Sequence, residues 1–177
     1  RVAAHSHYSV KPASRPGAHV SIDFKGIQTS PAGYRELLVI VDSANSRMAL
    51  SAQLGRTAEE TVQSLKDQVV YQWGTPTTIM SDQAKEFTGL VMSKFCKTNG
   101  VDQKNTHGYN ARANGQVETV MRYLNRAFRL LSDSEYKNWQ LHISRIAGAW
   151  NAHHMESLGC SPFEASHGYT MATPAES

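Results

Sequence analysis

Residues 18–54 read AHVSIDFKGIQTSPAGYRELLVIVDSANSRMALSAQL, and they carry the clearest strand pattern in the chain. Three runs there have the composition and length of β-strands, at about 18–26, 34–43 and 46–54. Turn-forming residues separate them, at 31–33 with a proline and a glycine and at 43–46 with two serines and an asparagine. Because both connections are short, we predict three antiparallel strands joined as a meander of hairpins.

The next part of the chain alternates helical patterns with short strands. Thr57 is a candidate helix cap, and apolar residues at helical spacing follow it until Gly74 and Pro76 end the helix. A second helix is predicted over about 87–99, with an inward side that contains Leu90, Phe95 and Cys96. Short strands are predicted at 77–80 and 101–106.

The last third of the chain is predicted to be helical after a loop over residues 107–115, which contain two glycines. A long amphipathic helix follows, with an apolar stripe formed by Val117, Val120, Leu124, Phe128 and Leu131. Another helical face is formed by Trp139, Ile143, Ile146 and Trp150. This order of elements predicts an α/β fold, with a mixed five-stranded sheet flanked by helices.

Three acidic residues, Asp23, Asp82 and Glu118, stand where an α/β fold can bring them together. Asp23 closes the alternating pattern of the first strand, and Asp82 follows the strand at 77–80. Glu118 is predicted at the start of the long helix, with 35 residues between it and Asp82. Three convergent carboxylates form the oxygen-rich site that Mg²⁺ or Mn²⁺ prefers. The alternative for Glu118 is that it complements the helix dipole and pairs with Arg122.

Four ordered motifs resemble those of retroviral and LTR-retrotransposon integrases. Asp23, Asp82 and Glu118, with their 35-residue gap, resemble the D,D-35-E signature of that family. The surrounding words are similar too, namely VSIDFKG at 20–26, SDQAKEFT at 81–88, ANGQVE at 113–118 and the gypsy-type exit motif SPFEASHG at 161–168. The resemblance covers roughly residues 17 to 170, which is most of the chain.

The resemblance implies a ribonuclease H-like fold and a metal-dependent polynucleotidyl transferase. Such an enzyme trims the 3′ ends of retroelement DNA and joins them to target DNA. Asp23, Asp82 and Glu118 would be the catalytic residues and would hold two Mg²⁺ or Mn²⁺ ions. The implied partners are double-stranded DNA and further copies of the chain. The implied location is the nucleus or a virus-like particle, inside the cell.

Some positions depart from the family's pattern. Residues 110–112 read Asn-Ala-Arg where the family usually has His-Pro-Gln, Ala84 replaces a glycine, and Thr119 replaces an arginine. None of these positions is one of the three acidic residues. They leave open a domesticated, integrase-derived domain that binds DNA or protein with little or no catalysis. A transposase or nuclease on the same fold is a further alternative, although the exit motif and the 35-residue gap argue against it.

The long helix and the loop before it are the candidate DNA surface. Residues 104–129 contain five Lys or Arg residues against one Glu, whereas the whole chain has a net charge of only +3. The candidate DNA-binding residues are Tyr109, Asn110, Arg112, Asn114, Gln116, Arg122 and Arg129. Lys25, Lys85 and Arg112 are possible phosphate contacts, and a solvated surface is the open alternative for each.

The 177 residues suffice for one domain, and we predict an arm or linker at 1–17 before a catalytic core at 18–177. No apolar run reaches the roughly 18 residues that span a bilayer, so no membrane partner is expected. The two cysteines form neither a disulfide framework nor a four-cysteine zinc site. The chain starts without Met or a signal-peptide core, so we expect a piece excised from a longer protein.

Overall fold

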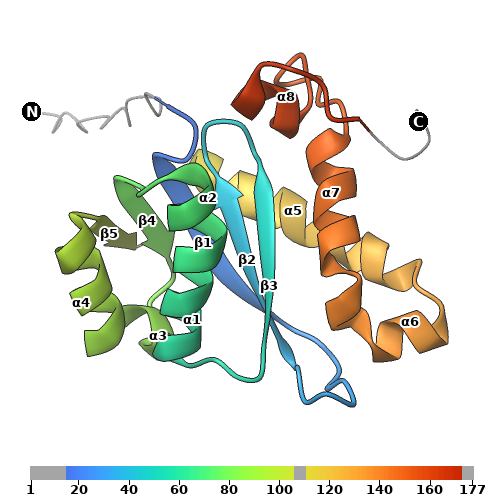
Figure 1. The fold of residues 1–177 in the computed structure, drawn as a ribbon, viewed down its shortest axis with the longest axis horizontal. Helices are drawn as coiled ribbons and strands as arrows, with labels where there is room; N and C mark the ends of the chain where they lie inside the picture. Colours follow the sequence, from blue (N-terminus) through green and yellow to red (C-terminus); the bar gives the residue numbers. More distant parts are fainter. Residues whose placement is uncertain (1–14, 106–110, 173–177) are drawn as a thin grey trace, which may run out of the picture.

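The structure is a computed structural model that describes residues 15–105 and 111–172, without the side chains of 105 and 111–114. The strands in these ranges lie in one mixed sheet. The strands are β1 His19–Gly26, β2 Glu36–Asp42, β3 Met48–Gln53, β4 Thr78–Ser81 and β5 Asp102–Asn105. Their order across the sheet is β3-β2-β1-β4-β5 (Figure 1). β1, β2 and β3 pair antiparallel, while β4 lies parallel to both β1 and β5. The predicted meander and mixed α/β sheet are confirmed.

One face of the sheet is covered by the helices that lie between β3 and β5 in the chain (Figure 1). These are α1 Ala58–Leu65, the π-helical turn η1 Lys66–Val70, α2 Tyr71–Trp73, α3 Lys85–Thr88 and α4 Leu90–Asn99. Thr57 caps α1, because its Oγ1 accepts the Glu60 backbone N–H at 3.2 Å. The core on this face joins alternate residues of β1 to the helices through Val20, Ile22, Phe24, Val62, Leu65, Phe87 and Phe95.

The opposite face is covered by the C-terminal helices. These are α5 Ala111–Arg129, α6 Asp133–Lys137, the 3₁₀ turn η2 Trp139–Leu141, α7 Ile143–Ala152 and α8 Pro162–His167. Their core packs β2 against α5 and α7 through Leu37, Val39, Val41, Val120, Leu124, Phe128, Trp139, Ile146 and Trp150. Asn151 of α7 donates to the Met48 carbonyl and accepts the Met48 N–H, both at 2.8 Å. This pair of bonds ties α7 to the outer strand β3.

The helix predicted over 87–99 is wrong in its first part. Gly89 adopts an extended conformation (φ −71°, ψ 168°) and separates α3 from α4. The break resets the phase of the following helix, so Leu90 is 86% exposed and its predicted inward placement is wrong. Phe95 and Cys96 are buried as predicted, and Met92 is buried with them.

The loop predicted over 107–115 is also wrong over its second half. α5 already begins at Ala111, while residues 106–110 lie outside the described part. The alanines at 111 and 113 are strong helix formers, and they outweigh Gly115. Glu118 therefore lies seven residues, or about 10 Å, along the helix rather than at its start. The helix-dipole explanation of Glu118 fails at that distance, since the effect is confined to the first turn.

The last residues of the predicted arm pack against the domain. Arg15 donates to the Thr75 carbonyl at 2.7 Å, and the Gly17 N–H donates to Asp42 Oδ2 at 2.7 Å. Gly17 has φ +75°, and a Cβ there would lie 3.1 Å from Trp73. Residues 1–14 lie outside the described part, so the boundary between arm and core stays a prediction.

Every helix in the described ranges is too short or too polar to cross a bilayer.

Candidate functional site

The sheet register places Asp23 and Asp82 at the same level of two neighbouring strands and on the same face of the sheet. Ser21 of β1 is in register with Met80 of the parallel strand β4. Two residues further along both strands, the side chains return to the same face at Asp23 and Asp82. Asp23 is in register with Val39 of β2, which packs under α5. Both carboxylates therefore lie on the face that α5 covers.

Asp23 is a half-buried carboxylate whose charge is disfavoured. Burial raises its pKa above the usual value, and the nearby Asp82 charge raises it further. The Phe24 backbone N–H, which donates to Asp23 Oδ1 at 2.8 Å, and the Arg56 guanidinium both lower the pKa, but the net direction is upward. A half-buried carboxylate whose ionisation is opposed by a second carboxylate nearby is an arrangement that a bound cation would relieve.

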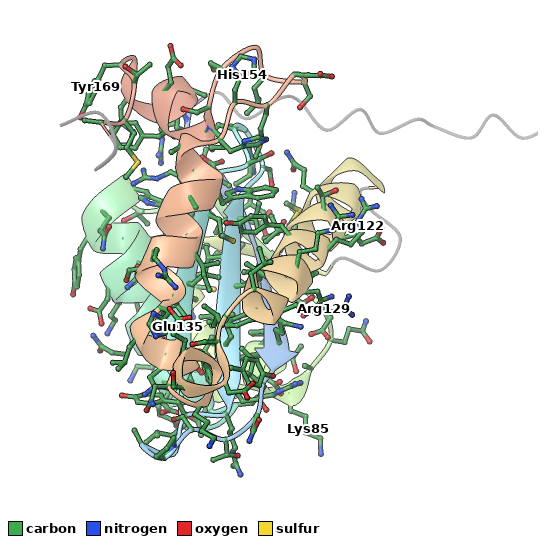
Figure 2. The ribbon with its side chains drawn as sticks, turned by 90° about the vertical axis from the view of Figure 1, so that its right-hand side faces the viewer. Lys85, Arg122, Arg129, Glu135, His154 and Tyr169 are labelled. Carbon is green, nitrogen blue, oxygen red and sulfur yellow. The ribbon has the colours of Figure 1, made fainter. Side chains whose placement is uncertain are left out.

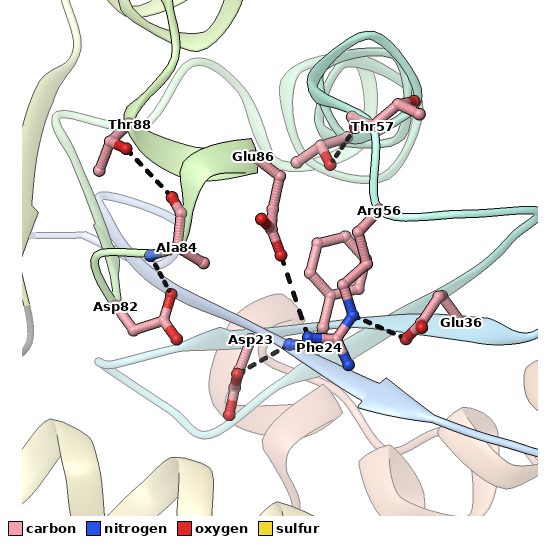
Figure 3. Close-up of polar contacts among 10 residues, drawn as sticks. Asp23, Phe24, Glu36, Arg56, Thr57, Asp82, Ala84, Glu86 and Thr88 are labelled. Atoms are coloured by element: carbon pink, nitrogen blue, oxygen red, sulfur yellow. Dashed lines mark hydrogen bonds and ion pairs between the residues drawn. The ribbon is translucent and has the colours of Figure 1, made fainter.

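Asp82 is exposed at the end of β4, in the short connection to α3. Its Oδ1 accepts the Ala84 backbone N–H at 3.0 Å, and Ser81 Oγ donates to its carbonyl at 3.1 Å. Figure 3 shows Asp82 near Asp23, each with a carboxylate oxygen on a backbone N–H. These bonds orient both side chains and leave the second oxygen of each for another ligand.

Glu118 is exposed on α5, on the same side of the helix as Asn125, which lies two turns further along and contacts Lys25 of β1. Two contacts position this part of the helix. Gln116 Nε2 donates to Ser43 O at 3.2 Å, at the turn beside the start of β1, and Asn125 Oδ1 accepts from Lys25 Nζ at 2.5 Å near its end. Glu118 lies between these two contacts along α5, nearer the one at the start of β1.

The three carboxylates are not drawn together into a formed metal centre. Within 15–105 and 111–172, no three His, Cys, Asp or Glu side chains are grouped closely enough to hold an ion. The structure therefore brings the Asp23–Asp82 pair together and places Glu118 on the adjacent helix. The donor chemistry fits a divalent cation, since both members of the pair are hard oxygen ligands with one uncommitted oxygen each. The role of Glu118 as third ligand stays a prediction.

The predicted DNA-binding residues fall into three groups. Tyr109 and Asn110 lie outside the described residues, and the side chains of Arg112 and Asn114 do too. Gln116 has hydrogen-bond partners inside the fold, because its side-chain Nε2 donates to Ser43 O and Ser46 Oγ in the turn between β2 and β3. Figure 2 shows the other two, Arg122 and Arg129, on one flank of α5, with Lys85 below them on the same side.

The pattern of the sequence did not reveal the role of Arg56, which lies beside the pair. Its Nε lies 3.0 Å from Glu36 Oε2 and its Nη1 4.0 Å from Glu86 Oε1 (Figure 3). Its guanidinium also stacks 5.4 Å from the centre of the Phe24 ring. Arg56 thus joins the segment before α1 to β1, β2 and α3, and Glu86 is held by this ion pair rather than by the carboxylate pair.

A mixed five-stranded sheet of this order, with helices on both faces and two carboxylates at neighbouring parallel strands, defines a ribonuclease H-like domain. Residues 13–111 match the family described as the integrase core domain, so more than half of the chain is covered. The chain belongs to the integrase core domain family.

Relatives of the chain include retroelement proteins. It is 27% identical over 165 residues to the Transposon Tf2-3 and Tf2-4 polyproteins of Schizosaccharomyces pombe. That match covers 92% of this chain and 12% of each polyprotein, so the chain spans a small part of these relatives.

Solved structures share the fold at low sequence identity. The catalytic core domain of BIV integrase superposes with a TM-score of 0.69 at 18% identity, covering 85% of this chain and 93% of that one. A chain of the simian T-cell lymphotropic virus intasome in complex with PP2A regulatory subunit B56 gamma gives a TM-score of 0.72 at 15% identity, covering 94% of this chain and 62% of that one. The predicted ribonuclease H-like integrase fold is confirmed.

Proposed function

We propose that the chain is the catalytic core of a retroelement integrase, a metal-dependent polynucleotidyl transferase. It would process the 3′ ends of the element's DNA and transfer them to target DNA. The observation that carries the proposal is the Asp23–Asp82 pair, two interacting carboxylates on the sheet face that α5 covers. Membership of the integrase core domain family supports the same activity.

The protein's own groups would hold and orient the reacting parts. Asp23 and Asp82 are already oriented by backbone N–H groups, so little ordering is needed when they bind a ligand. Glu118 would complete the set from α5. Two Mg²⁺ or Mn²⁺ ions, when bound, would activate the attacking hydroxyl and neutralise the leaving oxygen at phosphorus. No nucleophilic side chain is required, which agrees with the burial of Cys96 in the core.

DNA would approach along the flank of α5 that carries Arg122 and Arg129 (Figure 2). Both side chains are exposed, and phosphates bind such cations with strong salt dependence. The intasome similarity supports duplex DNA and further copies of the chain as partners. The retroelement relatives support a site of action in the nucleus or in a virus-like particle.

The proposal is tested by Asp82→Asn in a chain that includes the flanking segments of its retroelement, assayed for strand transfer of element-end DNA in Mg²⁺. We expect strand transfer to be lost while the thermal midpoint stays equal or rises, because one of two repelling charges is removed. Asp67→Asn is the matched control. Asp67 is exposed on the helices that cover the other face of the sheet, so this variant should keep full activity.

Equal strand transfer by Asp82→Asn and the parent would refute the catalytic assignment. A parent that binds duplex DNA but transfers no strand in Mg²⁺ or Mn²⁺ would instead favour the domesticated, non-catalytic domain. Cleavage of element DNA without joining would favour the transposase or nuclease alternative.

A further inference from the structure

A pocket of about 340 Å³ lies between the end of β1 and the C-terminal half of α5. Its lining combines two cations, an amide, a tyrosine and an apolar floor, and consists of Lys25, Gly26, Ile27, Asn125, Phe128, Arg129 and Tyr136. At about 30 Å³ per water molecule, the volume would hold on the order of ten waters, which is ample for a phosphate group. We call it the β1–α5 pocket.

The β1–α5 pocket is positively charged and has no acidic group in its lining. The ion pairs among the described residues use Arg56, Lys104 and Arg145, so neither Lys25 nor Arg129 is neutralised by a carboxylate there. Two unneutralised cations across a pocket are the arrangement that an anion binds. A cation would find no such complement.

The polar groups that line the β1–α5 pocket are oriented by contacts within the fold. Lys25 Nζ gives one of its three donor positions to Asn125 Oδ1 at 2.5 Å, which leaves the other Lys25 donors and the Asn125 amide nitrogen available to a ligand. The floor is equally constrained, because the rings of Phe128 and Tyr136 meet edge to face at 6.4 Å and Phe128 meets Trp139 at 6.2 Å. The ring contacts therefore hold the aromatic floor, and the mutual hydrogen bond holds Lys25 and Asn125 beside it.

The β1–α5 pocket lies next to the carboxylate pair. Lys25 is two residues beyond Asp23 on β1, so both side chains point to the same face, about 6.7 Å apart along the strand. Successive phosphates of one DNA strand are further apart in space than the rise along the helix axis, because the backbone winds around that axis, so this separation is on the scale of one backbone step. A DNA strand whose phosphate lies at Asp23 and Asp82 would place a neighbouring phosphate at this pocket.

We propose that the β1–α5 pocket binds a phosphodiester of the DNA backbone beside the scissile phosphate, through Lys25 and Arg129. Asn125 and Tyr136 add hydrogen bonds. The site would hold the register of the strand while Asp23 and Asp82 act on the neighbouring phosphate. This inference rests on the proposed function for its ligand, but its test needs neither metal nor activity.

The test is the salt dependence of duplex binding without metal. Labelled duplex DNA is titrated with the Lys25→Gln/Arg129→Gln double variant at several salt concentrations in EDTA. The log–log salt slope should become shallower by about 1.8, or 0.9 per lost contact. Between 50 and 200 mM salt the parent should therefore lose about twelvefold more affinity than the variant. Lys94→Gln, an exposed charge change on α4 at the opposite face, should leave the slope unchanged.

Asn125→Ala distinguishes two roles of Lys25, namely contact with a phosphate and structural support of α5 through the bond to Asn125. It removes the bond to Lys25 but no charge, so the proposal expects the parent slope. A parent slope in the double variant, with a cooperative thermal transition, would overturn the proposal. So would Asn125→Ala changing the slope as much as Lys25→Gln, because Lys25 would then act by holding α5 in place.

Two further arms identify the ligand and isolate the proposal. Inorganic phosphate at constant ionic strength should weaken DNA binding more in the parent than in the double variant, because the two cations of the pocket would bind either anion; equal weakening in both would overturn the proposal. Asp82→Asn should keep the parent slope. If the parent transfers no strand but the double variant shows the expected slope change, the result counts against the proposed function alone. If the parent is active but the double variant keeps the parent slope, the result counts against the pocket alone.

Discussion

The packing of α5 sets where Glu118 points, and Leu124→Ala tests that packing. Leu124 is fully buried between α5 and the sheet, at 0% exposure, whereas Leu130 just beyond the helix is 86% exposed. Removing a buried leucine side chain costs about 2–5 kcal/mol, with a central value of roughly 3 kcal/mol. In a domain of this size each kcal/mol lowers the thermal midpoint by about 2–4 °C. Leu124→Ala should therefore lower it by about 6–12 °C.

Leu130→Ala is the matched control, since it makes the same chemical change one and a half turns further along the chain. Exposed substitutions usually stay within about 0.5 kcal/mol, so its midpoint should move by no more than about 2 °C. Scanning calorimetry or circular dichroism measures both. Equal shifts in the two variants would mean that the apolar stripe of α5 does not face the sheet. The flank assigned to Glu118 and Asn125 would then be wrong as well.

Three further predictions concern the site. In EDTA, Asp23→Asn should be more stable than the parent at pH 7. Because the pKa of Asp23 is raised in the folded state, ionisation of this carboxyl opposes folding as the pH rises above 3.8. Denaturant titrations should therefore show that the variant's advantage in free energy of unfolding vanishes toward and below pH 3.8. Arg56→Gln should raise the pKa of Asp23 further by removing a nearby positive charge, and a carboxyl NMR titration that finds no change would contradict this. Arg122→Gln should flatten the salt slope of duplex binding by about 0.9, and Arg126→Gln, off the Glu118 flank, should not; equal slopes in both variants would exclude Arg122 as a phosphate contact.

Much of the fold could be predicted because its signals are local. The alternation around Val20, Ile22 and Phe24 marks a strand with one face in the core, and the register of β1 and β4 then pairs Asp23 with Asp82. The start of α5 was misjudged because residues 113–116 combine loop-forming and helix-forming residues, and packing against the sheet decides between them. Leu90 was misplaced because the break at Gly89 changes the helical phase.

The contacts that complete the site join residues far apart in the chain. Arg56 meets Glu36 and Glu86, and Lys25 meets Asn125 one hundred residues away. No periodicity connects such residues, and a lone lysine or arginine in a sequence is usually a solvated surface group. The two ion pairs of Arg56 and the β1–α5 pocket could therefore be recognised only once the sheet and α5 were placed.

The central claim is that Asp23, Asp82 and Glu118 hold catalytic divalent ions, and a crystal soaked in Mn²⁺ tests it most directly. The account predicts anomalous density between the Asp23 and Asp82 carboxylates, at roughly 2.0–2.2 Å from their oxygens, with Glu118 drawn in as a further ligand. The same soak of Asp82→Asn should show the density weakened or lost. Mn²⁺ bound elsewhere in the parent, with none at Asp23 and Asp82 when the ion is saturating, would contradict the account.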